Sequence, residues 1–161
     1  MITIVPEYEE QEYDDMGSFN HSVIQANLAY LLKSSGDYSV AIELSLDTSG
    51  IDLSEFHVRD ELKPDVCIYP KRPLSLPYDI LKMREMPPLI IEVLSPRQGI
   101  LTIIEKFGAY FELGVDSCWL VDPITQTVHV YSSPTQRTTF TEGTVSDPIV
   151  NIELAIAAIF D

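Results

Sequence analysis

The run PLIIEVLS at residues 88–95 constrains the fold more than any other feature of the chain. Successive side chains of a strand point to opposite faces, and here aliphatic residues occupy both faces apart from Glu92. Such a pattern is typical of a strand buried on both sides at the centre of a sheet. It therefore predicts a layered structure in which helices cover a sheet.

Two helices are predicted by apolar residues at helical spacing. The first begins after Ser18, a good N-cap residue, and ends near Gly36. The second spans residues 99–113 and stops at Gly114. Its apolar stripe consists of Ile100, Ile103, Ile104, Phe107 and Phe111.

Strand patterns lie around these helices. Residues 38–46 alternate with period two, which predicts that Glu43 lies on the face opposite four aliphatic side chains. Residues 63–69 predict a strand with Asp65, Cys67 and Tyr69 on one side. A hairpin of residues 117–122 and 127–132 follows, then a strand at 137–143 and a closing segment of undetermined type.

The predicted order is helix, strand, strand, strand, helix, strand, with C-terminal additions. We expect an α/β (α+β) fold with a central mixed sheet flanked by helices. The 161 residues contain no repeat and no Gly/Ser linker, so a single domain over 1–161 is expected, with an acidic, partly irregular lead at 1–16.

The net charge of −15 argues against a protein that binds nucleic acid with its whole surface, because phosphate contacts need Lys and Arg. The charge is unevenly distributed, since residues 7–15 carry six acids and eight of the ten basic residues lie between 59 and 106. These eight form either a functional strip or ordinary solvated surface. They are Arg59, Lys63, Lys71, Arg72, Lys82, Arg84, Arg97 and Lys106.

The sequence also predicts a cellular compartment. The N-terminal residues lack a basic region followed by a long apolar stretch, and the apolar C-terminal run is too short to cross a bilayer. Cys67 and Cys118 lie in separate strand-like runs without CxxC spacing, which favours reduced, buried thiols over a disulfide or zinc site. We expect a cytoplasmic protein without membrane contact.

Glu92 is the strongest single indication of a functional site. A carboxylate inside an aliphatic strand is costly to bury unless it is paired, protonated or bound to a cation. Asp65, near the start of the preceding strand, could alone be a turn or cap residue. Together, two carboxylates on adjacent strands can hold a hard divalent cation and leave positions for water and phosphate, although a salt bridge is the alternative for Glu92.

Lys106 is the third candidate. It lies about two turns into the second helix, on the side shared with Tyr110, where its stem can be buried while its amine reaches the strand ends. The alternative is an ordinary surface lysine.

Three segments carry a resemblance to a known family: KPDVCIYP, PPLIIEVLSPRQ and EKFGAYFELGVDSCWLVDP. In their order and spacing the chain resembles the Uma-two (Uma2) family of restriction endonuclease-like proteins, within the PD-(D/E)XK nuclease superfamily. The resemblance covers nearly the whole chain. It implies a restriction endonuclease-like fold and a metal-dependent endonuclease that hydrolyses phosphodiester bonds of DNA with Mg²⁺ or Mn²⁺.

The resemblance also implies roles for individual residues. Asp65 and Glu92 would bind the metal, the main-chain carbonyl of Val93 would complete the ligand set, and Lys106 would orient or activate the attacking water. Glu43 resembles an accessory acid that could bind a second metal or a metal-bound water. His21 matches a histidine common in such chains, although a capped or core-edge histidine is the favoured interpretation.

Two positions depart from the family pattern. The superfamily lysine expected two residues after Glu92 is replaced by Leu94, and Lys106 is its natural substitute. Thr102 stands where the family usually has an Asp one turn before the lysine, which leaves open a catalytically degenerate binding or oligomerisation module. The charge leaves open a hydrolase of another phosphate-containing substrate, and a homodimer is expected for a small domain that cuts two strands.

Overall fold

The computed structural model describes residues 17–58 and 61–161, so the predicted acidic lead (1–16) and Arg59 lie outside the described residues. Its main elements follow the predicted order. They are α2 (Phe19–Ser34), β1 (Tyr38–Ile42), the short 3-10 helix η1 (Leu53–Phe56), β2 (Val66–Pro70), β3 (Leu89–Val93), α3 (Ile100–Leu113), β4 (Ser117–Asp122), β5 (Thr127–Ser133) and β6 (Gln136–Phe140). The C-terminal additions are β7 (Thr144–Asp147), β8 (Ile152–Ala155) and α4 (Ile156–Ile159).

The first six strands form one mixed sheet in the order β1-β2-β3-β4-β5-β6. β3 and β4 pair in parallel, with α3 as the connection between them, whereas the other neighbouring pairs of this sheet are antiparallel. All five residues of β3 are buried, as the aliphatic run predicted. The strand that carries Glu92 is therefore at the centre of the sheet.

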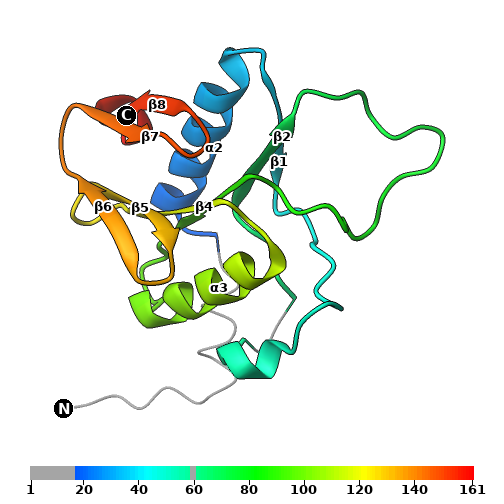
Figure 1. Cartoon of the computed structure of the whole chain (residues 1–161). Helices are drawn as coiled ribbons and strands as arrows, with labels where there is room; N and C mark the ends of the chain where they lie inside the picture. Colours follow the sequence, from blue (N-terminus) through cyan, green and yellow to red (C-terminus); the bar gives the residue numbers. More distant parts are fainter. Residues whose placement is uncertain (1–16, 59–60) are drawn as a thin grey trace.

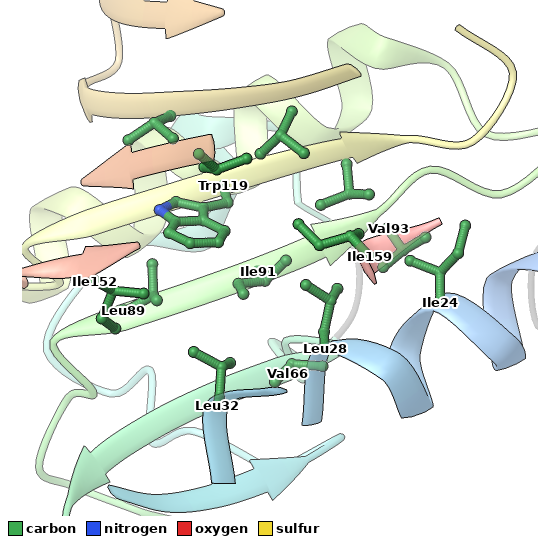
Figure 2. Close-up of a cluster of buried hydrophobic side chains, with 14 of the residues drawn as sticks. Ile24, Leu28, Leu32, Val66, Leu89, Ile91, Val93, Trp119, Ile152 and Ile159 are labelled. Carbon is green, nitrogen blue, oxygen red and sulfur yellow. The ribbon is translucent and has the colours of Figure 1, made fainter. Parts of the chain in front are cut away.

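The two long helices cover opposite faces of the sheet (Figure 1). Figure 2 shows Ile24, Leu28 and Leu32 of α2 facing the strands in one buried cluster that includes Trp119. The second cluster lies under α3 and contains Ile103 and Phe107. Alternate residues of β2 serve the two clusters, so Val66 and Ile68 join the first and Cys67 and Tyr69 the second.

The helix ends agree with the predicted signals. The Ser18 hydroxyl accepts a hydrogen bond from the backbone N–H of His21, and Gly114 ends α3 with a left-handed φ of 107°. One member of the predicted stripe is misplaced, because Ile100 is half exposed at the first turn of α3. Tyr110 and Ala109 are buried instead.

The predicted strand over 38–46 is too long. β1 ends at Ile42, and Glu43 adopts a left-handed φ of 52°, which interrupts the extended backbone. The aliphatic side chains therefore do not share one face: Val40 packs in the first cluster, whereas Leu44 and Leu46 pack in the second and Ile42 is exposed. The turn at Glu43 carries the chain from one layer to the other.

The C-terminal β7–β8 hairpin and α4 are joined to the sheet and to α2 by polar contacts. The buried Asp147 carboxylate accepts hydrogen bonds from the Ser117 hydroxyl and from Trp119 Nε1, the latter at 2.7 Å. Asn27 Nδ2 of α2 donates to the carbonyl oxygens of Ile159 and Asp161 at 3.1 Å each. These contacts position α2, which carries His21, relative to the sheet.

The cysteine prediction is confirmed, since Cys67 and Cys118 are buried and free. Across residues 17–58 and 61–161, no helix combines the length and apolarity that a bilayer crossing requires.

Candidate active site

A polar pocket of about 560 Å³ opens at the end of the sheet where β2 begins and β3 ends. The antiparallel pairing of these strands brings Asp65, one residue before β2, close to Glu92 near the end of β3. His21 of α2 and Lys106 of α3 line the same pocket from the two covering layers. The site therefore combines residues from both sides of the sheet.

Asp65 is held at the end of the sheet by two hydrogen bonds. Its Oδ2 accepts from the backbone N–H of Val93 at 2.7 Å and lies 3.1 Å from His21 Nε2. Because Asp65 precedes the first residue of β2, its side chain can reach the α2 layer as well as β3. The bond to Val93 is an additional connection between the start of β2 and the end of β3.

Glu92 lies on the α3 side of β3 and is only 3 % exposed. Tyr110 of α3 donates its hydroxyl to Glu92 Oε1 at 2.8 Å. Burial is the main cause that raises the pKa of Glu92 to about 8, and the nearby Asp65 adds to it, while Lys106 and the Tyr110 hydrogen bond act against it. The unliganded side chain therefore keeps its proton to a higher pH than an exposed glutamate does.

Lys106 is partly buried on α3 and lines the pocket together with both carboxyl groups. Its charge is close enough to lower the pKa of Glu92, yet among the ion pairs of the described residues none joins Lys106 to Asp65 or Glu92. The amine is therefore positioned near the acids without being neutralised by a direct contact. Thr102, one turn earlier, is exposed.

Glu43 and Val93 occupy different places in the site. Glu43 is exposed on the pocket wall, and its charge contributes to the raised pKa of His21. The largest cause of that raised pKa is the hydrogen bond to Asp65. For Val93, the structure shows the N–H bound to Asp65, while the carbonyl oxygen remains the predicted metal ligand.

Two side chains of the site were not given these roles from the sequence. His21 was interpreted as a capped or core-edge residue, but it contacts Asp65 across 44 positions of the chain. Tyr110 bonds Glu92, and its one sequence signal was its place four residues after Lys106. Lys63 also lines the pocket and is half exposed.

The donor set suits a hard divalent cation better than zinc. Asp65 and Glu92 supply adjacent carboxylate oxygens at an open pocket, whereas among the described residues no group of three or more His, Cys, Asp or Glu side chains forms a ready-made metal cluster. Mg²⁺ usually keeps several waters and takes only one or two carboxylates plus substrate phosphate. A two-carboxylate site fits that behaviour, and a cation would relieve the cost of ionising Glu92.

Six of the eight central basic residues, all within the described part of the chain, lie in two separate places. Lys63 and Lys106 line the pocket. Lys71, Arg72, Lys82 and Arg84 instead belong to the long connection between β2 and β3, where Arg72 pairs with Glu85 and Arg84 with Asp47.

The fold is a mixed sheet covered by one long helix on each face, with a polar pocket at one end that contains two carboxyl groups. The profile of the Uma2 family, described as "Putative restriction endonuclease", matches residues 10–158, and the chain belongs to this family.

A solved structure shares the fold. It is described as a putative nuclease belonging to DUF820 from Anabaena variabilis ATCC 29413, with a TM-score of 0.72 and 23% sequence identity, over 90% of this chain and 82% of that chain. No curated protein matches the chain significantly.

Proposed function

We propose that this chain is a divalent-metal-dependent endonuclease that hydrolyses phosphodiester bonds of DNA at the Asp65–Glu92 pocket. The observation that carries the proposal is the meeting of two carboxyl groups and one lysine in a polar pocket at the end of a buried sheet. The family description and the nuclease fold of the Anabaena protein support it.

Asp65 and Glu92 are the residues that would hold Mg²⁺ or Mn²⁺, with the Val93 carbonyl and Glu43 as further proposed oxygen donors. When bound, such an ion supplies charge that polarises a scissile phosphate and offsets the negative charge of the departing oxygen. His21 and the Val93 N–H fix Asp65, and the Tyr110 hydroxyl fixes Glu92, so that both carboxylates face the pocket with little freedom.

Lys106 is proposed to orient the attacking water. The side chain is partly buried on α3 and lines the pocket together with both carboxyl groups. A lysine ammonium donates hydrogen bonds but cannot bind a cation, so its contribution is separable from metal binding. This difference between Lys106 and the acids is the basis of the test.

The test is cleavage of supercoiled plasmid at low salt with Mg²⁺ or Mn²⁺, alongside calorimetric metal titration. Wild type should nick the plasmid, and chelator should stop it. Asp65→Asn and Glu92→Gln should lose cleavage and metal binding together, whereas Lys106→Ala should bind metal normally and cleave at least about 100-fold more slowly. Lys33→Ala, at the far end of α2, is the matched lysine control and should behave as wild type.

Two results would contradict the proposal. Equal trace cleavage by wild type and all variants would show that the activity comes from a contaminant. It would favour a catalytically degenerate binding or oligomerisation module, an alternative supported by the exposed Thr102 at the position where the family usually has an Asp. Normal cleavage by Lys106→Ala alone would leave the metal site standing but remove the proposed role of the lysine.

The substrate and the assembly follow from the same proposal. The net charge of −15 disfavours a long duplex, so short oligonucleotides and small phosphodiesters belong in the assay beside plasmid. A symmetric homodimer is the arrangement that would present two such pockets to two strands.

A further inference from the structure

The connection between β2 and β3, residues 71–88, is a long loop that projects from the sheet (Figure 1). It carries several exposed apolar side chains. Of the twelve large hydrophobic residues that are exposed in the described part of the chain, five lie in this one loop. Leu74, Leu76, Tyr78 and Leu81 are 80–86% exposed, and Ile80 is 46% exposed. Single exposed apolar residues are ordinary, but a concentrated group marks an interaction surface.

The loop is fixed to the body of the protein at its first residues. The backbone N–H of Lys71 donates to the Asp37 carbonyl at 3.0 Å, and Ser39 Oγ both accepts from the Arg72 N–H and donates to the Arg72 carbonyl. The Arg72 guanidinium lies 4.9 Å from the centre of the Tyr69 ring.

The last residues of the loop are fixed in the same way. Arg72 pairs with Glu85, and the Tyr69 hydroxyl donates to the Glu85 carbonyl at 2.8 Å. The Met83 N–H donates to the Ser45 carbonyl, and the Asp47 N–H donates to the Met83 carbonyl, both at 2.9 Å. The apolar tip, residues 74–81, is therefore presented from an anchored base.

The tip is poorly placed to serve the pocket of its own protomer. The loop leaves β2 after Pro70 and enters β3 at Leu89, which are the strand ends opposite to Asp65 and Glu92. In Figure 1 it extends from the sheet away from the rest of the chain. The exposed leucines also lack the donors that phosphate contacts require, so a protein surface fits the tip better than nucleic acid.

The charge of the loop points to another copy of the same chain. Residues 71–88 carry four basic and two acidic side chains, whereas the remaining sequence carries six basic and twenty-three acidic ones. A basic, apolar projection on an acidic protein is complementary to the body of a second copy. Arg72 and Arg84 pair within the protomer, so Lys71 and Lys82 are the basic residues of the loop that face an acidic partner, and charge favours a second copy in that place.

The available area is compatible with a stable contact. Five large side chains at these exposures offer on the order of 500 Å² of apolar surface, and reciprocal contacts in a symmetric pair double it. Standard interfaces bury about 800 Å² from each partner, and the loop backbone and the stems of its basic residues can supply the remainder.

We propose that the 71–88 loop is a dimerisation arm, whose apolar tip and basic residues dock on a second copy of this chain. The arm is independent of the proposed nuclease activity, because it uses none of the pocket residues. The two proposals can therefore fail separately, because self-association is measured without substrate and cleavage is measured without reference to the loop.

The test is analytical ultracentrifugation of the full chain over about 1 to 200 µM. Wild type should associate to a dimer. The variant with Leu74→Ser, Leu76→Ser and Leu81→Ser should raise the dimer Kd at least about 100-fold, since each side chain loses its burial. Ile124→Ser, equally exposed at 83% in the β4–β5 turn, is the control and should leave the Kd unchanged.

Charge gives a second, independent measurement. Lys71→Glu with Lys82→Glu should weaken the dimer about tenfold or more at low salt, and high salt should weaken the wild-type dimer toward the same value. Arg137→Glu on β6 is the matched control. If circular dichroism shows that the triple variant is unfolded, the single variant Leu81→Lys repeats the test of the apolar tip.

Three outcomes would contradict the dimerisation arm. If wild type stays monomeric over the whole concentration range, the proposed interface does not form. If the triple variant still dimerises, the dimer uses another surface. A monomeric wild type whose DNA binding falls on the triple substitution would assign the loop to nucleic acid instead.

Discussion

Replacing Glu92 with glutamine should make the metal-free protein more stable at neutral pH. The side chain is 3 % exposed, accepts the Tyr110 hydroxyl at 2.8 Å and lies beside Asp65. Glutamine keeps this shape, because its carbonyl oxygen can accept from Tyr110 while its amide donates toward Asp65. It thus reproduces the protonated form of Glu92 and cannot ionise.

The size of the effect follows from proton binding. The pKa of Glu92 is raised from 4.5 to about 8, first by burial and then by Asp65, so between these values the folded protein holds a proton that the unfolded chain has lost. The stabilisation that protonated Glu92 contributes is fully present below pH 4.5, and it is lost as the pH rises toward about 8. The slope is at most about 1.4 kcal/mol per pH unit, which amounts to about 2–3 kcal/mol between pH 5.5 and 7.5.

The assay is urea unfolding of wild type and Glu92→Gln in chelator at these two pH values. The advantage of the variant should grow by about 2–3 kcal/mol from the lower to the higher pH. Other groups that titrate in this range, His21 among them, affect both proteins and largely cancel in the difference. Glu112→Gln, an exposed position on α3, is the matched control and should show the same small difference at both pH values.

If the free energies of unfolding of Glu92→Gln and wild type differ by the same amount at both pH values, the raised pKa of Glu92 is refuted. That result would mean that Glu92 ionises equally easily in the folded and unfolded chain. Destabilisation by glutamine at both pH values would point instead to a carboxylate that is already compensated by Lys106.

Three further predictions concern the same structure. Burial raises the pKa of the Cys67 thiol to about 12 and that of Cys118 well above its ordinary value, so a thiol reagent at pH 8 should label neither in the native protein and both in denaturant. Rapid native labelling would contradict the burial. Millimolar Mn²⁺ should raise the melting temperature of wild type by a few degrees, because a ligand that binds only the folded form stabilises it. The melting temperature of Asp65→Asn should not change. A shift in both proteins would indicate that Mn²⁺ binds at another site. Tyr110→Phe should lower the free energy of unfolding, measured in urea, by about 1–2 kcal/mol. The loss should be larger at pH 8 than at pH 5.5, because the missing hydrogen bond favours the ionised form of Glu92. An equal loss at both pH values would argue against that preference.

Much of the fold could be predicted because its determinants are local in the sequence. The aliphatic run 88–95 identified the central strand, and Ser18 and Gly114 marked helix ends by their own capping chemistry. Periodicity also placed Asp65 and Glu92 on neighbouring strands. Their meeting at one end of the sheet is a finding of the structure, where β2 and β3 pair antiparallel.

Other features depend on contacts that no local pattern encodes. Leu44 and Leu46 continue the alternation of β1, and apolar side chains fit either layer, so the sequence could not reveal the turn at Glu43. His21 reaches Asp65 only after α2 has packed on the sheet, which is a tertiary event. The partner of Glu92 was equally hidden, because a buried Tyr110 is ordinary in a helix stripe.

The contact between Trp119 and Asp147 provides the protein with an internal spectroscopic reporter. Trp119 is the single tryptophan of the chain, and its indole is fully buried in the cluster beneath α2, with Nε1 bonded to the Asp147 carboxylate. Its fluorescence therefore reports on the docking of the C-terminal hairpin on that face of the sheet. The two thiols lie in the cluster beneath α3, so indole emission and thiol reactivity follow the two halves of the interior separately. Coincident transitions of the two signals would identify a single cooperative unit, and an earlier emission change would show the α2 face opening while the α3 face stays packed.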